Sequence, residues 1–115
     1  MTYKAPVDDI VFTLNHEAGF NRLVQSGAYP ELSDDLVDAI LDEAAKFADN
    51  VVAPLSWEGD QTGARLEADG VKVPESFKEA YRKYVDSGWS TLAAPTDYGG
   101  QGLPLALSNA VTEIM

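Results

Sequence analysis

Three aspartates in the sequence have a spacing that could gather carboxylates around a hard cation. Asp34, Asp38 and Asp42 recur every fourth residue, so a helix would place them one turn apart on one face. No histidine or ligand-bearing loop accompanies them, and runs of like charge usually form a solvated helix face. We therefore interpret these aspartates as surface residues and predict no metal site.

The acidic segment from Asp60 to Asp69 also invites a calcium interpretation. An EF-hand loop requires glycine at its sixth position and glutamate at its twelfth. Counted from Asp60, these positions hold Arg65 and Val71, so the segment does not match an EF-hand.

The single histidine limits the acid–base and metal chemistry of the chain. His16 stands alone, which excludes a two-histidine metal site and a histidine pair relay. No Gly-x-Ser-x-Gly sequence holds a serine as a nucleophile. We expect His16 to lie at the surface or at a helix end, and we assign no catalytic residue.

A glycine-rich turn from Tyr98 to Gly102 is the nearest approach to a phosphate-binding loop. A Walker loop would need lysine and serine or threonine after the last glycine, where Leu103 and Pro104 stand. The dinucleotide-binding pattern Gly-x-Gly-x-x-Gly is not matched, because Leu105 occupies the position of its third glycine. We interpret the glycines as serving a tight turn, with contact to a ligand or cofactor as the alternative.

Composition excludes several classes of function. The chain has 115 residues, 45% of them hydrophobic, and a formal net charge of −11, which disfavours binding to nucleic acid. It has no cysteine, so disulfide scaffolds and thiol chemistry are excluded and the reducing cytoplasm is the expected compartment. No apolar run is long enough for a signal peptide or a membrane span.

Apolar periodicity and capping residues predict three main helices and two short ones. Ser33 is a plausible N-cap, Pro74 and Pro104 suit first helical positions, and Gly88 suits the position after a helix end. We expect the first main helix to end near Val52 or to loosen into an irregular turn, because the following proline lacks a backbone donor. The predicted helices are Ser33 to Val52, Pro74 to Ser87, Pro104 to the end of the chain, Asp8 or Asp9 to Leu14, and Phe20 to Ser26.

The remaining segments predict connections rather than strands. The stretch from Trp57 to Lys72 has no sustained period and is interpreted as a long connection. Strand patterns are sparse, so the predicted fold class is all-α. We divide the chain into a leader, residues 1–32, and a helical domain, residues 33–115. The last helical pattern has no terminating residue, and we interpret it as cut within a helix.

Aromatic residues fall into two predicted groups. Tyr81 and Tyr84 continue an apolar helical stripe and are expected in the core. Trp57, Trp89 and Tyr98 lie in predicted connections and are the better candidates for an interface.

Several motifs follow one another in a characteristic order along the chain. From Ser33 onwards they are Ala44-Ala45-Lys46-Phe47-Ala48, Val52-Ala53-Pro54, Asp60, Gly63, Gly70-Val71-Lys72-Val73-Pro74, Phe77-Lys78-Glu79-Ala80-Tyr81, Gly88-Trp89, and Pro95 to Pro104, and before Ser33 they are Tyr3 to Ile10 and Tyr29-Pro30-Glu31-Leu32. The motifs from Ser33 onwards resemble the N-terminal helical domain of the acyl-CoA dehydrogenase family. Those before Ser33 resemble the extra leader of longer bacterial members, so the resemblance covers nearly the whole chain.

The resemblance implies an all-α fold and a flavoenzyme. In that family a glutamate base and FAD convert an acyl-CoA thioester to a trans-2-enoyl-CoA, and an electron-transfer acceptor reoxidises the flavin. Most FAD contacts and the catalytic base come from later domains, so no catalytic or cofactor-binding role passes to this chain. We expect FAD in the full-length parent, no FAD bound to this chain alone, and a homo-oligomer.

The resemblance also implies that this chain reaches the edge of the acyl pocket. The candidate residues come from the glycine-rich turn and the inward face of the Pro104 helix: Tyr98, Gly99, Gly100, Gly102, Leu107, Ala110, Val111 and Ile114. The alternative interpretation is a non-catalytic helical module that mediates interaction or dimerisation through apolar patches.

Overall fold

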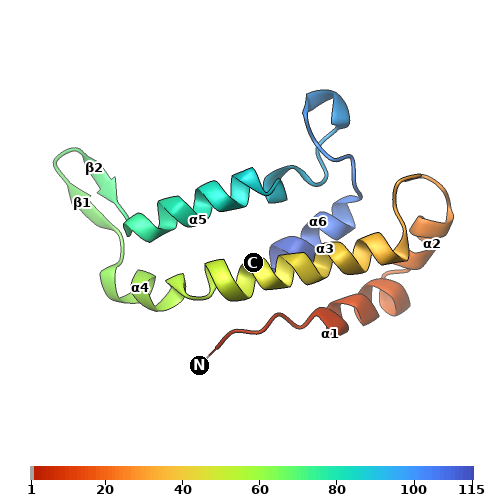
Figure 1. Cartoon of the computed structure of the whole chain (residues 1–115), viewed down its shortest axis with the longest axis horizontal. Helices are drawn as coiled ribbons and strands as arrows, with labels where there is room; N and C mark the ends of the chain where they lie inside the picture. The colour runs from red at the N-terminus through yellow and green to blue at the C-terminus, as the bar shows by residue number, and fades with distance from the viewer. Residues whose placement is uncertain (1) are drawn as a thin grey trace.

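The computed structural model describes residues 2–115, which form a mostly helical chain with one small hairpin (Figure 1). The predicted all-α class is confirmed, because the strands within this range are three residues each and pair only with one another. The elements are α1 (Val7–Phe12), η1 (Thr13–Glu17), α2 (Phe20–Gln25), α3 (Asp34–Phe47), η2 (Ala48–Val52), α4 (Leu55–Thr62), β1 (Arg65–Glu67), β2 (Gly70–Lys72), α5 (Glu75–Asp86), η3 (Trp89–Thr91), η4 (Thr96–Tyr98) and α6 (Leu105–Ile114).

The long helix α3 begins as its sequence predicts. The Ser33 hydroxyl accepts a hydrogen bond from the Leu36 amide at 3.2 Å, which satisfies one of the unpaired donors of the first turn. Asp34 and Asp35 lie in that turn, where the helix dipole favours acidic groups. Leu41 and Ala44 on its buried face are fully shielded from solvent.

The helical path loosens before Pro54, as expected from the missing donor of proline. Residues Ala48–Val52 form the π-helix η2, in which the Ala53 amide donates to the Ala48 carbonyl at 2.8 Å. A wider turn of this kind often occurs where a helix must accommodate an irregularity or a functional site. Here it precedes a proline that cannot join the helical hydrogen-bond ladder.

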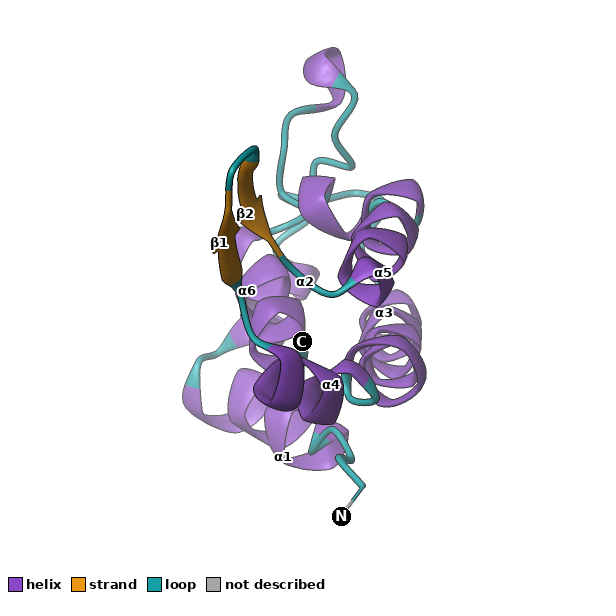
Figure 2. Ribbon diagram, turned by 90° about the vertical axis from the view of Figure 1, so that its left-hand side faces the viewer, coloured by secondary structure: helices purple, strands orange, loops and turns teal. Residues whose placement is uncertain are grey.

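The predicted connection from Trp57 to Lys72 is wrong, because this stretch is structured. Pro54 directly precedes α4, and its φ of −60° is compatible with a helix. Its missing amide hydrogen costs nothing there, because amides at a helix start have no partner within the helix. The chain then forms the antiparallel hairpin β1–β2, in which Leu66 pairs with Val71 (Figure 2). The two-residue loop between the strands precedes Gly70, whose φ of 126° suits glycine.

The N-terminal leader is part of the folded core. Helix α1 begins after Pro6, so Asp8 and Asp9 lie in the first turn and the expectation that one of them is the N-cap is wrong. Helix α2 agrees with the predicted Phe20 helix. The leader contributes several buried apolar residues to one cluster with α3 and α6: Ala5, Ile10, Leu14, Phe20 and Leu32 from the leader, Val37, Leu41, Ala44 and Ala48 from α3 and η2, Leu92, and Leu107, Ala110, Val111 and Ile114 from α6.

Helix α5 runs back alongside α3 in the opposite direction but stands outside the core (Figures 1 and 2). Their contact includes the rings of Phe47 and Tyr84, with centroids 6.4 Å apart, and Phe47 also meets Trp89 edge to face at 6.2 Å. Tyr81 is 67% exposed, so its expected place in the core is wrong. Helix α3 covers only part of the apolar stripe of α5, and Tyr81 and Val85 of this stripe remain exposed.

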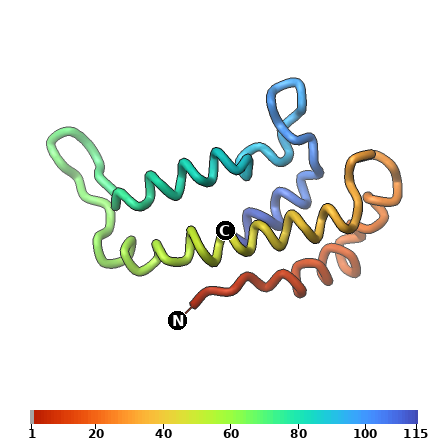
Figure 3. The backbone as a smooth tube through the Cα atoms, in the orientation of Figure 1, coloured from red at the N-terminus to blue at the C-terminus, as the bar shows by residue number. Residues whose placement is uncertain are grey.

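The described chain is elongated, with extents of 54 × 37 × 18 Å. In residues 2–115 we find no helix with the length and apolar character needed to cross a membrane. The backbone trace in Figure 3 shows the leader, α3 and α6 gathered on one side and the hairpin with α5 forming an arm.

Candidate edge of a substrate pocket

Helix α6 places half of the candidate residues against the rest of the core. Pro104 precedes the first turn with φ −59° and ψ 142°, and the helix packs on α3. Leu107, Ala110, Val111 and Ile114 form its buried face. The opposite side of the helix is polar or exposed, beginning with Leu105 at 66% exposure. The four residues expected on the inward face of this helix are thus the ones that the structure buries.

The glycine-rich turn places the other candidates away from α6. Tyr98 is 88% exposed at the end of η4, in the loop at the top of Figure 1. Gly99 and Gly102 have φ of 81° and 64°, which other residues rarely adopt. Gly100 has no room for a side chain, because a Cβ there would lie 2.0 Å from the Ala94 carbonyl oxygen. These glycines are required by the turn itself.

The backbone donors of the turn are used within the turn. The Gly99 amide donates to the Thr96 carbonyl at 3.1 Å and the Gly100 amide to the Pro95 carbonyl at 3.0 Å. The Gly102 amide donates to the Ala94 carbonyl at 2.9 Å. A phosphate cradle needs amides that point outward without partners. The structure therefore favours the structural interpretation of this loop.

Two grooves bring candidate residues to the surface. Ile114 lines a groove of about 750 Å³ between the N-terminal segment, the π-helix η2 and the end of α6. Ala110 lines a smaller groove of about 360 Å³ between α1 and α6. Leu107 and Val111 line neither groove, since both side chains lie deep in the core. The eight candidates therefore do not form one site. Four lie in the projecting turn, Leu107 and Val111 lie in the core, and Ala110 and Ile114 line two different grooves.

The larger groove includes residues that the sequence analysis does not name as candidates for the pocket edge. Tyr3 and Lys4 form one wall, and Asp49, Val52 and neighbouring residues of η2 form another. The Tyr3 hydroxyl donates to the Ile114 carbonyl at 2.7 Å. No local pattern reveals this contact, because it joins residues at opposite ends of the chain. Only the expected loosening of the helix before Pro54 points from the sequence to this region, because the loosened segment lines the groove.

The acidic residues and the histidine do not assemble a further site. In the part of the chain that the structure describes, no three metal-binding side chains lie together. His16 is exposed and stacks on Phe12, with ring centroids 4.6 Å apart. These positions agree with the predicted surface roles of His16 and of the aspartates on α3.

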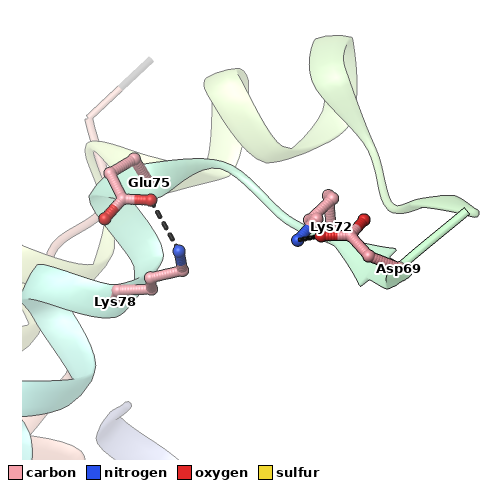
Figure 4. A network of polar contacts seen from close by, with 4 residues as sticks. All are labelled: Asp69, Lys72, Glu75 and Lys78. Carbon is pink, nitrogen blue, oxygen red and sulfur yellow. Dashed lines mark hydrogen bonds and ion pairs between the residues drawn. The ribbon is translucent and has the colours of Figure 1, made fainter. Parts of the chain in front are cut away.

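Ion pairs on α5 account for the two carboxyl groups with shifted pKa values, and Figure 4 shows the first of them, between Lys78 and Glu75. Lys78 donates to Glu75 at 2.7 Å, and this hydrogen bond and the charge of Lys78 lower the pKa of the Glu75 carboxyl. Lys83 similarly lowers the pKa of Glu79, first through its hydrogen bond and then through its charge. All these side chains are exposed, so the pairs stabilise the helix surface and form no catalytic dyad.

Comparison with known proteins connects this helical fold to one family. The family model described as "Acyl-CoA dehydrogenase, N-terminal domain" matches residues 35–115, which is most of the chain. The chain belongs to the acyl-CoA dehydrogenase family. The match begins within the first turn of α3 and leaves the leader outside.

Curated relatives extend the acyl-CoA dehydrogenase match into the leader. The chain is 43% identical to the 3-methylmercaptopropionyl-CoA dehydrogenase of Ruegeria pomeroyi over 115 residues, which cover 100% of this chain and 20% of the relative. It is 27% identical to the broad-specificity linear acyl-CoA dehydrogenase FadE5 of Mycobacterium tuberculosis over 113 residues, 96% of this chain and 18% of that protein. It is 30% identical to a butyryl-CoA dehydrogenase of Syntrophomonas wolfei over 90 residues, 75% of this chain and 15% of that protein. The chain therefore spans about a fifth or less of the length of these relatives.

Proposed function

We propose that the chain serves as the N-terminal helical domain of an FAD-dependent acyl-CoA dehydrogenase. In the whole protein the reaction is α,β-dehydrogenation of an acyl-CoA thioester to a trans-2-enoyl-CoA. The observation that carries this proposal is the family match over residues 35–115, on a chain whose described part is helical. Two relatives that match the leader as well are named for a sulfur-containing acyl-CoA and for linear acyl-CoA thioesters, which supports an acyl-CoA substrate.

The proposed role of the chain is scaffold and pocket edge. Ala110 and Ile114 lie on groove walls and are the candidates for direct contact with an acyl chain. Leu107 and Val111 hold α6 on the core and so fix the position of those walls. The turn from Tyr98 to Gly102 sets the direction in which the chain enters α6, and the exposed Tyr98 ring is available to a neighbouring domain.

The residues of this chain do not fit a complete flavin site. A flavin dinucleotide carries a pyrophosphate, which requires unpaired amides or basic side chains. The amides of the glycine-rich turn have internal partners, and Lys4 is the only basic residue among the described residues that line the larger groove. The net charge of −11 opposes capture of a dianionic group. We therefore propose that FAD is held by other parts of the whole protein and that this chain alone binds none.

A domain exchange tests the proposed function. The segment of the Ruegeria pomeroyi enzyme that matches this chain is replaced by this chain, and flavin absorbance and acyl-CoA-dependent reduction of an artificial electron acceptor are measured. We expect the chimera to bind FAD and to turn over, because the exchanged segment supplies the same scaffold. The unmodified enzyme and a form without the segment are the controls. A folded chimera that binds no FAD and has no activity would contradict the proposal.

The alternative function is a helical interaction module, and the exposed apolar residues on α4, the hairpin and α5 favour it. Trp57 is 74% exposed on α4, and Leu66, Val71 and Tyr81 are also exposed on the hairpin and α5. Analytical ultracentrifugation of the chain and of a Trp57→Ser, Tyr81→Ser variant tests whether these residues mediate self-association. Because the proposed dehydrogenase is itself a homo-oligomer, the module is supported only if the double substitution dissociates a dimer and the folded chimera is inactive. For the whole dehydrogenase we propose a homo-oligomer, a cytoplasmic location and an electron-transfer protein as acceptor.

A further inference from the structure

Residues 55–86 run from α4 through the hairpin β1–β2 to α5, and we name them the α4–α5 unit (Figures 1 and 3). The two helices and two strands of this unit contain no buried residue. The buried apolar cluster comes instead from the leader, α3 with η2, Leu92 and α6. Segments with few buried apolar contacts open at a lower free energy than the core of a protein. The core therefore contributes little to holding the unit in place.

The unit has few links to the rest of the chain. Within residues 2–115, its hydrogen bonds and ion pairs to residues outside it reach only Ala53 on one side and Ser87 and Gly88 on the other, which are its neighbours in sequence. Across space, the contact with α3 includes the rings of Tyr84 and Phe47, with centroids 6.4 Å apart. The unit can therefore leave α3 without breaking a long-range hydrogen bond.

Two contacts join α4 to α5 inside the unit. The Ser76 hydroxyl donates to Oε2 of Glu58 at 2.5 Å. Next to it, the Phe77 ring lies against the backbone of Gly59, where a Cβ would come within 2.7 Å of the ring atom Cζ. Adjacent residues of α4 thus meet adjacent residues of α5, and we name this pair of contacts the clasp. Because both helices contribute to it, the opening of either helix breaks the clasp.

We propose that the α4–α5 unit opens away from α3 as one cooperative unit while the core stays folded, and that the clasp couples its two helices. Opening uncovers the side of α3 that carries Phe47. This device goes beyond the proposed dehydrogenase function and does not depend on it, because it involves neither flavin nor acyl-CoA. The contacts that it breaks all lie between Phe47 and Gly88, so it does not depend on either end of the chain.

Amide hydrogen exchange of the chain, measured by NMR, tests the cooperative opening. The Gln61 amide reports on α4, the Tyr84 amide on α5, and the Leu41 amide in the middle of α3 on the core. We expect Gln61 and Tyr84 to share one free energy of opening, and Leu41 to be protected about tenfold more strongly or better. Equal protection of all three amides would refute separate opening of the unit. Unequal protection of Gln61 and Tyr84 would refute its cooperativity.

A serine substitution tests the hydrogen bond of the clasp. Ser76→Ala removes the donor, and Ser56→Ala is the matched control, because each serine is the second residue of its helix and only Ser76 donates to a side chain within the described chain. We expect Ser76→Ala to accelerate exchange about fivefold at Gln61 and Tyr84 alike, the effect that one net hydrogen bond supports. Leu41 should keep its rate. An increase confined to α5, or an equal increase at Leu41 or in the control, would contradict the clasp.

A second substitution tests the aromatic contact of the clasp from the side of α5. Phe77→Ala removes the half-buried ring that lies on Gly59, and Tyr81→Ala is the control, because its ring lies one turn further along α5 and is 67% exposed. We expect Phe77→Ala to accelerate exchange at Gln61 of α4 about tenfold or more, with Leu41 unchanged. An unchanged rate at Gln61, or the same increase in the control, would refute the coupling of the two helices.

Discussion

Substitution of Gly100 by alanine should be the most disruptive single change in the glycine-rich turn. The new Cβ would lie 2.0 Å from the oxygen and 2.3 Å from the carbon of the Ala94 carbonyl. Both are backbone atoms, so a rotamer change cannot relieve the clash. The backbone at residue 100 and the backbone at Ala94 must move apart. Separation strains or breaks the hydrogen bonds from Gly100 to Pro95 and from Gly102 to Ala94. Overpacking and the loss of one or two hydrogen bonds together predict a loss of about 3 kcal/mol in the free energy of unfolding.

Urea unfolding followed by circular dichroism measures this loss. Gly99→Ala is the matched control, because a Cβ at Gly99 meets no atom within 4 Å while its φ is 81°. Positive φ alone predicts a loss of about 1 kcal/mol. We therefore expect the free energy of unfolding to be highest for the unmodified chain, lower for Gly99→Ala and lowest for Gly100→Ala. A Gly100→Ala variant as stable as Gly99→Ala would refute the view that close backbone approach determines this glycine.

Three further predictions concern the core, a helix cap and a surface ion pair. Leu107→Ala should lower the free energy of unfolding by about 3 kcal/mol, because Leu107 is fully buried, whereas the exposed Leu105→Ala should cost less than about 0.5 kcal/mol in chemical denaturation. Ser33→Ala removes the acceptor of the α3 N-cap and should cost about 1 kcal/mol in the same assay. Since Lys78 lowers the pKa of Glu75 in the folded chain, the stability from this pair is present above pH 4.5 and is lost as the pH falls through the lower folded value. Lys78→Gln should make stability less dependent on pH in that acidic range, and an unchanged pH profile would contradict the assignment.

Local sequence signals were sufficient for the main helices. The Ser33 cap and the apolar period predict α3, and Gly88 marks the end of α5 through a positive φ of 79°. These features depend on residues close in sequence, so propensity and capping determine them. The same reasoning predicts that the Ser33 helix ends near Val52 or loosens before Pro54, but it does not predict that a new helix begins at this proline. A proline also suits the start of a helix, and α4 follows it directly.

A local pattern indicates a turn within the stretch that is expected to be a long connection. Asp69-Gly70 lies between the apolar residues Leu66 and Val71 and is typical of a turn, although the loop itself is Ala68-Asp69 and Gly70 pairs with Glu67 as the first residue of β2. Its strands are short and exposed except at the half-buried Gly70, so they lack the alternating burial on which strand recognition depends.

The candidate pocket edge was predictable only in part. The period of α6 identifies its inward face, but it cannot distinguish a core contact at Leu107 from a groove wall at Ile114. That distinction depends on which elements cover each position, and the leader and α3 are far away in sequence. The two walls to which Tyr3 and Asp49 belong meet wholly through such long-range packing.

The shared core of the leader, α3 and α6 has a consequence for synthesis on the ribosome. Ile10 and Leu14 emerge early, but their cluster also requires Val111 and Ile114, which are translated last among these elements. The apolar face of α3 therefore stays uncovered by α6 while the hairpin and α5 are being made. Contacts between distant residues form late because the intervening chain must first be ordered. We expect the nascent chain to depend on a chaperone over this interval, and to become protease-resistant only once α6 has left the ribosome.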